Sequence, residues 1–487
     1  MKKFLIFAVT ALLMGCGGDD NDKQTQACPE KVTVLEHEHS KAFPLTPSEY
    51  QGSLYQSFAW ANTVRDPMRD ALEVRTASAY APLSAEAKEE LAALATEKDI
   101  ISQIGGMGSA KLPDGATSAS DHFTAYMNSI IQDNGAGWRA AIQSRAQEVA
   151  QVLPDEATFY WQIGNEINAA SYTRNAVFYF DNQTGRLTNE TFGMKVYIEY
   201  FLAPTLQALR AAEVSTGKSI KAALGSVSAF TAPASQQFLN NLLNYEIEGT
   251  YAPELTGQKV HELIDIITIH YLAFYNDPAK PLYWRNTLET LYDNWVANNI
   301  EGVWVTEEVG INMADGGIGA STALTVTNRY LELAVSRQLS PTQIRWFYYG
   351  TNAGPEGQRI DDALTHLNTQ TQNTPLTHIS TQIVDCSREF SVYGLGTKED
   401  NNGLLILISE LSNNNLGSWY YWAGGTTLEY ILTGEEVISA IHYTPTGSSE
   451  YDPQPQLAYV KGDIDGIHFD DPDTGLNAQE STIAIIR

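Results

Sequence analysis

Short apolar segments alternate with longer helical patterns from about residue 70 to 350, and this alternation constrains the fold more than any other feature of the chain. Strands that alternate with helices form parallel α/β sheets, because each helix returns the chain to the same edge of the sheet. Strands are expected at 54–60, 72–80, 99–104, 158–163, 220–226, 264–270, 302–306 and 344–349. Eight strands in such a run predict an α/β fold of the (β/α)8 TIM barrel type over residues 50–380.

Helices are expected between these strands, over 85–97, 138–151, 194–213 and 282–298. After the last strand, residues 350–372 are polar, and we expect a long loop there. Loops that follow barrel strands are where function concentrates, so this loop is a candidate for substrate contacts.

The C-terminal part of the chain has a different sequence pattern, without the alternation of strands and helices. After about residue 380, β-rich segments are broken by Asn, Gly and Asp. This pattern predicts an accessory β-sandwich domain over 381–487, and the segment 31–49 before the barrel can add a strand to it.

The acidic balance of the chain narrows its partners. It carries 58 acidic and 30 basic side chains, a formal charge of -28. Such a charge repels phosphate backbones and anionic lipid surfaces, so nucleic acid is excluded as an expected partner. A neutral or weakly charged ligand remains compatible with it, although acidity also serves solubility.

The N-terminus has the pattern of an export signal. Lys2 and Lys3 precede an apolar run over 4–14, which is followed by Gly15 and Cys16. This resembles the bacterial lipobox, which implies lipidation of Cys16 after cleavage; an ordinary signal peptide that contains a cysteine is the alternative. We therefore expect a signal segment over 1–16, a flexible tether over 17–30 and attachment to a bacterial membrane, the outer membrane being expected, on its periplasmic or surface face.

Two further cysteines remain if Cys16 is lipidated. They are Cys28 and Cys386. Export to an oxidising compartment permits a disulfide between them, and the sequence leaves that pairing open.

Two strand ends carry the residues with catalytic potential. Asn165 and Glu166 follow the apolar segment 158–163, and the pair Glu307 and Glu308 follows the segment 302–306. Catalytic groups of (β/α)8 barrels lie at the C-terminal ends of the strands. Two carboxylates placed there are what retaining glycosidases use, one as acid/base and one as nucleophile, with about 5 to 5.5 Å between them.

The amino-acid sequences of these two segments are similar to those of a known enzyme family. Tyr160-Trp161-Gln162-Ile163-Gly164-Asn165-Glu166 and Thr306-Glu307 resemble the clan A retaining glycoside hydrolases, in particular the arabinofuranosidase-type and xylosidase-type branches. Members of that clan carry an Asn-Glu pair at the end of strand four and the nucleophile at the end of strand seven. Those branches also carry a β-sandwich beside the barrel, as expected here.

The resemblance implies a role for each matching residue. Glu166 would be the general acid/base, and Asn165 would donate a hydrogen bond to the sugar 2-hydroxyl. His270 and Tyr271 would bond the nucleophile or the substrate. On the last strand, Trp346 or Tyr348 is expected to form an aromatic floor for a sugar ring, since sugars present apolar C–H faces that stack on aromatic rings.

The identity of the nucleophile is left open by the sequence. Aligning the strand end Trp304-Val305-Thr306-Glu307 selects Glu307, whereas aligning Glu-x-Gly selects Glu308. Neighbouring residues of a strand point to opposite faces, so only one of the two can face the site. We favour Glu307, because a strand end is more constrained than the loop after it.

No metal or organic cofactor is implied. The run Glu36-His37-Glu38-His39 and the aspartates near 463 and 470 invite a metal reading. The first has no partner cluster, and we interpret it as a solvated edge. The second lacks the spacing of a calcium loop, and we interpret it as turns.

Together these features predict a retaining glycosidase that hydrolyses O-glycosyl bonds of an extracellular poly- or oligosaccharide. Three alternatives remain at this point. A transglycosylase would use the same carboxylates with a sugar hydroxyl in place of water, and a non-catalytic surface lipoprotein would bind glycans without cleaving them. A scaffold or adhesin built mainly on the β-sandwich would make the carboxylates at the strand ends accidental. The sugar, the linkage and the choice between endo and exo cleavage depend on loops, and the sequences of these loops do not indicate a substrate.

Overall fold

The computed structural model describes most of the region that the sequence predicts to form the barrel. The described residues are 33–35, 46–55, 69–76, 83–104, 128, 130–168, 190–228, 233–270, 283–310, 323, 326–327, 330–331, 333–334, 337–349, 354–371, 376–385, 388–395, 404–410, 437–444, 447–451 and 481–486. Cys16, Cys28, Cys386, the signal segment and the tether lie outside them, and lipidation and the disulfide stay predictions.

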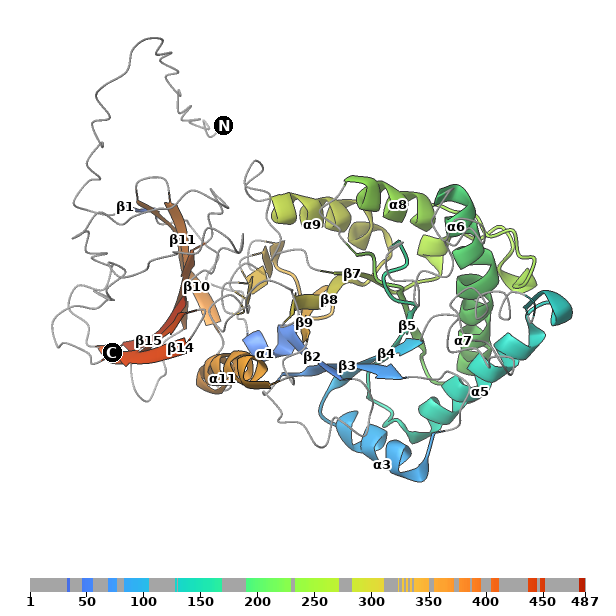
Figure 1. Ribbon diagram of the computed structural model, residues 1–487, viewed down its shortest axis with the longest axis horizontal. Helices are drawn as coiled ribbons and strands as arrows, with labels where there is room; N and C mark the ends of the chain where they lie inside the picture. Colours follow the sequence, from blue (N-terminus) through green and yellow to red (C-terminus); the bar gives the residue numbers. More distant parts are fainter. Residues whose placement is uncertain are drawn as a thin grey trace, which may run out of the picture.

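Eight parallel strands close into a barrel, which confirms the predicted (β/α)8 fold (Figure 1). Closure is achieved by pairing of the first strand with the last, Gly52 lying opposite Phe347. The strands are β2 (Gln51–Tyr55), β3 (Ala71–Thr76), β4 (Asp99–Ile104), β5 (Phe159–Ile163), β6 (Lys221–Leu224), β7 (Ile266–His270), β8 (Gly302–Gly310) and β9 (Ile344–Tyr349).

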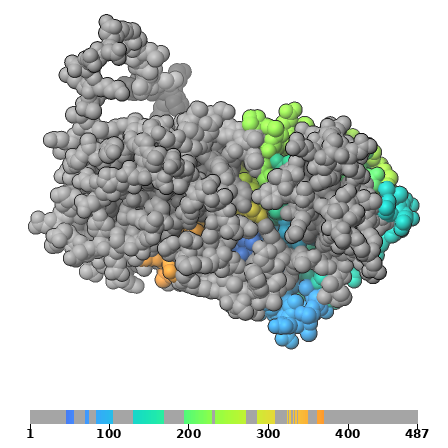
Figure 2. Space-filling model, in the orientation of Figure 1, coloured from blue at the N-terminus to red at the C-terminus, as the bar shows by residue number. Residues whose placement is uncertain are grey.

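Helices surround this barrel, as Figure 1 shows. They are α1 (Pro47–Tyr50), α3 (Ala85–Leu94), α5 (Ala136–Val152), α6 (Glu190–Tyr197), α7 (Ala203–Thr216), α8 (Pro233–Leu243), α9 (Tyr283–Asn294) and α11 (Gly354–Thr371). A π-helical turn over Ile198–Leu202 joins α6 to α7. In the space-filling view α3, in light blue, and part of α5, in teal, lie on the outer surface, as expected for helices that shield a barrel (Figure 2).

Helix α11 corrects one expectation. Residues 350–372 were expected to be a loop, but most of this stretch is helical. The reason is an apolar face that its polar composition hides: Ile360, Ala363, Leu364 and Leu367 recur at helical spacing and are all fully buried. A helix needs only such a stripe to pack against a barrel.

The interior of the barrel is filled by side chains in layers. A lower layer near the N-terminal ends of the strands is apolar and includes three aromatic residues: Ala71, Ile101, Tyr160, Ala223, Ile266, Trp304 and Phe347. The Tyr160 and Trp304 rings meet at 4.6 Å between centroids. A side chain at Gly52 would overlap the Phe347 ring, since a Cβ there would lie 2.1 Å from it. This layer closes the N-terminal end of the barrel, and strand alternation then fixes which residues face inward above it.

The C-terminal strands form one antiparallel sheet, drawn in orange and red in Figure 1. Its order is β1-β10-β11-β12-β15-β13-β14, where β1 (Thr33–Leu35) from before the barrel pairs with β10 (Leu376–Asp385). The others are β11 (Arg388–Leu395), β12 (Leu404–Glu410), β13 (Val437–Thr444), β14 (Gly447–Tyr451) and β15 (Ser481–Ile486). A second layer that would complete a sandwich is not among the described strands, and the sandwich stays a prediction.

Within the described part of the chain, no helix combines the length and the apolar character that crossing a bilayer requires.

Candidate active site

Glu166 lies just beyond the end of β5, the fourth strand of the barrel, in an unusual backbone conformation. Its φ is 47°, in the left-handed region, and Gly164 two residues earlier has φ 97°. A left-handed conformation costs a residue with a side chain roughly 1–2 kcal/mol, so it persists only where the surroundings impose it. Such strain is concentrated at functional sites, and it directs attention to this carboxylate.

Hydrogen bonds on both sides of Glu166 impose this conformation. The Gly164 amide donates to the Ile104 carbonyl at 3.2 Å, and the Ile167 amide donates to the Ser226 carbonyl at 2.9 Å. Next along the chain, the Asn168 side chain donates to the Ser228 carbonyl at 2.9 Å and accepts from the Ser228 amide at 2.8 Å. The segment that carries Glu166 is thereby fastened to the chain that follows β6.

Glu307 lies in β8, the seventh strand, at an irregularity in the pairing with β7. Ile269 lies opposite Val305, but the next residue, His270, lies opposite Glu307, so Thr306 is an extra residue in β8. This is a β-bulge, and bulges redirect side chains next to active sites. Since Trp304 faces inward, strict alternation would turn Glu307 outward; the bulge instead brings it to the interior beside His270.

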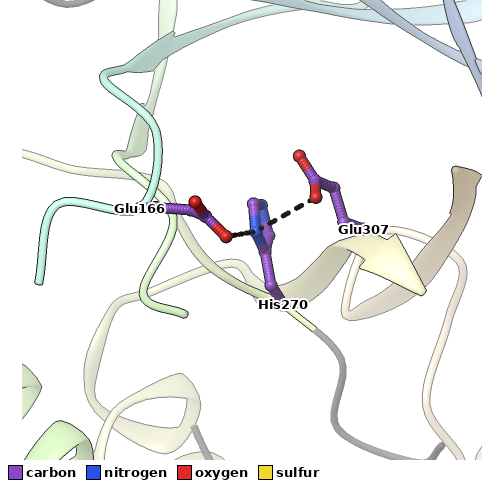
Figure 3. Close-up of side chains that lie close together, drawn as sticks. All are labelled: Glu166, His270 and Glu307. Atoms are coloured by element: carbon purple, nitrogen blue, oxygen red, sulfur yellow. Dashed lines mark hydrogen bonds and ion pairs between the residues drawn. The ribbon is translucent and has the colours of Figure 1, made fainter. Parts of the chain in front are cut away.

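His270 joins the two glutamates, as Figure 3 shows. Its Nδ1 lies 3.3 Å from Oε1 of Glu166 and 3.5 Å from Oε2 of Glu307. All three side chains are buried, and His270 is fully so. With the proton on Nδ1, the imidazole donates a hydrogen bond toward Glu166 and lies at ion-pair distance from Glu307. One imidazole thus fixes the relative position of two carboxylates that come from strands four and seven.

Among the described residues, these three form a cluster that could in principle hold a metal ion. One ligand atom from each lies within 4.8 Å of the others. Two carboxylates and one imidazole are a donor set that several transition metals accept, so the expectation of a metal-free site needs its own test.

The other predicted residues are placed as follows. Asn165 is buried, and its Oδ1 accepts no hydrogen bond from the described residues. Glu308 lies in β8 opposite Tyr348, and its side chain is outside the described set. Tyr271 also lies outside it. The structure therefore brings together Glu166, His270 and Glu307, next to Asn165.

Trp346 and Tyr348 are not brought to this site, and their prediction as an aromatic floor is corrected. Phe347 faces the barrel interior, so its two neighbours on β9 face outward. Trp346 stacks on Tyr330 at 5.0 Å, and Tyr348 donates to the Ala323 carbonyl at 3.2 Å. Both are fully buried under the helical layer, because strand parity, which the sequence alone did not fix, places them there.

A polar layer beneath the three residues was missed by the sequence analysis. It consists of Gln162, Ser226, Thr268 and Thr306, all fully buried and connected by hydrogen bonds. A partial signal exists for Gln162, Thr268 and Thr306, since each is a hydroxyl or amide near the end of an expected strand, but the inward direction of their side chains comes from the structure. Ser226 ends the strand expected at 220–226, whereas in the structure β6 stops at Leu224, two residues before it.

Comparison with known proteins finds similar structures only at low sequence identity. No family model matches the chain, and no curated protein matches it. Among solved structures, a glucosidase from Croceicoccus marinus is similar over 94% of this chain and 98% of its own, at 9% identity and a TM-score of 0.43. GH26C from Muricauda sp. MAR_2010_75 covers 66% and 86%, at 10% identity and a TM-score of 0.41.

The catalytic domain of a GH26 endo-β-1,4-mannanase from Bacillus sp. JAMB-750 covers 70% of this chain and 93% of its own, at 12% identity and a TM-score of 0.37. These neighbours are glycoside hydrolases by name. Their scores are too low to carry an argument, so the fold rests on the strand pairing and the function on the site itself.

Proposed function

We propose that this protein is a retaining glycoside hydrolase in which Glu166 is the acid/base and Glu307 the nucleophile. The observation that carries the proposal is the spacing of their carboxylates: one oxygen of each lies within 4.8 Å of the other. Retaining enzymes hold these groups about 5 to 5.5 Å apart, whereas inverting enzymes leave about 6.5 to 9.5 Å so that a water fits between sugar and base. The short distance supports direct attack by a carboxylate.

The reaction then has two steps. Glu166 gives its proton to the glycosidic oxygen while a carboxylate oxygen of Glu307 attacks the anomeric carbon; the leaving alcohol departs and a glycosyl ester forms on Glu307. Glu166, now a carboxylate, takes a proton from water, and the water oxygen attacks the same carbon. The ester breaks, the sugar leaves with its original anomeric configuration, and both glutamates return to their starting states.

His270 supports both steps through position. Its contacts to Glu166 and Glu307 limit the rotation of both carboxylates, and its burial shields these contacts from water. Preorganised groups of this kind lower a barrier because little reorganisation remains when charge develops.

The substrate we propose is an extracellular poly- or oligosaccharide, reached by an enzyme that Cys16 anchors to the membrane of a bacterium. A net charge of -28 suits a neutral glycan better than an anionic polymer. A transglycosylase and a glycan-capture protein are the competing functions, and the test below separates both from hydrolysis.

The test is chemical rescue. A protein lacking residues 1–27 is assayed on 4-nitrophenyl glycosides of xylose, arabinofuranose and glucose, and on plant and algal polysaccharides. Glu307→Ala is expected to be inactive and to regain turnover with azide, yielding a glycosyl azide of inverted configuration; Glu308→Ala is the matched control and should retain activity. Reducing-sugar release identifies hydrolysis, and products longer than the substrate identify transfer.

Two outcomes would contradict the proposal. Rescue of Glu308→Ala instead of Glu307→Ala would move the nucleophile by one residue. Glycan binding without cleavage of any substrate would favour the capture protein. In parallel, EDTA treatment should leave turnover unchanged, because no step uses the cluster as a metal site.

A further inference from the structure

A chain of buried hydrogen bonds runs directly beneath the two carboxylates. Gln162 Nε2 donates to the Gly164 carbonyl at 3.1 Å and to Ser226 Oγ at 2.9 Å. Ser226 Oγ in turn lies 2.9 Å from Thr306 Oγ1. The two ends of this chain are informative, since Gly164 begins the strained turn of Glu166 and Thr306 directly precedes Glu307.

Two more contacts attach the rest of the site to the same centre. Thr268, two residues before His270 on β7, lies 3.2 Å from Ser226 Oγ and donates to the Leu224 carbonyl at 2.6 Å. Gln103 on β4 donates to the Gly164 carbonyl at 3.4 Å. Ser226 is therefore the meeting point of β5, β7 and β8, each of which carries or leads to one residue of the site.

We propose that Ser226, Thr306 and Gln162 are positioning residues that set the separation of the Glu166 and Glu307 carboxylates. This inference rests on the proposed function and deepens it. In the lower layer the Tyr160 and Trp304 rings also join β5 to β8, but near the two glutamates the described polar contacts between these strands run through His270 and through this chain. This chain of three side chains spans the barrel from the turn that carries Glu166 to the residue that precedes Glu307.

The contrast with the layer below supports a special role. On the same strands one layer lower, the barrel interior is filled by Tyr160, Ile266 and Trp304, which pack without a connected polar network. Burying hydroxyl and amide groups carries a desolvation cost unless their hydrogen bonds are made. A fully buried network at the layer next to the site therefore points to a requirement for defined geometry, which directional hydrogen bonds provide and apolar contacts do not.

The test uses a pair of substitutions at Thr306. Thr306→Val keeps the shape and removes the hydroxyl, whereas Thr306→Ser keeps the hydroxyl and removes the methyl group. Thr306→Val is expected to lower kcat by about 10- to 100-fold with KM changed by less than about twofold, because a carboxylate displaced by a fraction of an ångström attacks poorly. Thr306→Ser is expected to recover most of this kcat.

Thr205→Val is the matched control for the loss of a buried hydroxyl. Thr205 is fully buried in α7, away from the barrel interior, and accepts a hydrogen bond from Trp138 Nε1 at 2.9 Å. Its loss should lower the melting temperature about as much as Thr306→Val does and leave kcat at the wild-type value. The inference is overturned if Thr306→Val and Thr306→Ser lower kcat equally, or if neither changes it.

A second readout does not depend on activity. Crystal structures of the wild type and Thr306→Val should show the nearest Glu166 and Glu307 oxygens further apart in the variant by about 0.5 Å or more; an unchanged separation overturns the inference. The two proposals fail differently. If Glu307→Ala keeps its activity, the proposed function is wrong, whereas an inactive Glu307→Ala beside a Thr306→Val of normal kcat and normal spacing removes only this inference.

Discussion

The two ends of the barrel both carry buried or half-buried carboxylates, but the partners of these carboxylates differ. At the N-terminal end, three of the described carboxylates have a cation beside them: Asp99 lies 2.8 Å from Arg345, and Lys221 contacts both Glu301 and Asp265. At the C-terminal end, Glu166 and Glu307 share a buried imidazole instead. Charges at the first end are matched for stability, whereas the second end keeps two acids close together on a strained backbone.

Two pKa values at the N-terminal end show how far these ion pairs offset burial. Burial alone would lower the pKa of Lys221, but its hydrogen bond to Glu301 and the charges of Asp265 and Glu301 outweigh burial and raise it. Burial raises the pKa of Asp265, against the opposing effects of the Ala222 amide and Lys221. Carboxylates with cation partners are thus an ordinary structural feature, and the arrangement at the other end is the one that indicates function.

The comparison is tested most strongly by removing one carboxylate charge at each end. Glu307→Gln should lower kcat by about 10⁴-fold or more, since the nucleophile is lost, and Glu166→Gln should lower kcat/KM by roughly 10²- to 10⁴-fold. Glu301→Gln should leave kcat unchanged and lower the free energy of unfolding by about 1 kcal/mol or less, because the pair is partly exposed. Steady-state kinetics and urea unfolding measure both; equal loss of activity at the two ends would remove the distinction.

A smaller effect is expected at the shared imidazole. His270→Leu should lower kcat by about 10²-fold, since two carboxylates lose the group that orients them. His270→Asn, whose amide nitrogen can occupy a position near that of Nδ1, should lose less. A Leu variant as active as the Asn variant would show that His270 only fills space.

The smallest effect concerns alkaline pH at the N-terminal end. Burial first, and then the charge of Glu301, raise the pKa of Tyr160 above its ordinary value of 10.0. Above pH 10 the unfolded chain releases this proton while the folded chain keeps it, so the folded state is destabilised as pH rises, by roughly 1 kcal/mol one pH unit higher.

Tyr160→Phe removes this group together with its hydrogen bond to Glu301. Its free energy of unfolding should therefore fall less than that of the wild type between pH 8.5 and pH 11, measured by urea unfolding at each pH. An identical fall in both proteins would show that Tyr160 does not titrate on unfolding.

The sequence predicted the barrel well, because an alternation of strands and helices over 280 or so residues has few other solutions. It also predicted the two strand ends that meet, since strands four and seven of a closed barrel present their ends to one mouth. It did not establish which side chains of each strand point into the barrel. The bulge at Thr306 and the outward direction of Trp346 depend on contacts between distant segments. The helix Gly354–Thr371 differs, because its apolar residues at helical spacing are a local signal that its polar composition hid.

Ser226 illustrates the same limit from the other side. The sequence predicted it as the last residue of a strand, the structure places it two residues beyond β6, and neither position distinguishes it from other serines near strand ends. Its importance comes from three partners that lie 42 to 80 residues away along the chain. Local patterns predict elements, and only the folded chain shows which hydroxyl lies at their centre.

The bulge in β8 has one more consequence. A regular strand offers every second side chain to a barrel, but here two successive residues, Thr306 and Glu307, both point inward. A reactive group and one of its positioning residues are thus adjacent in the chain, while their partners His270 and Ser226 come from other segments. The chain can drift in sequence around this pair, yet an insertion or deletion between its two members would separate them at once.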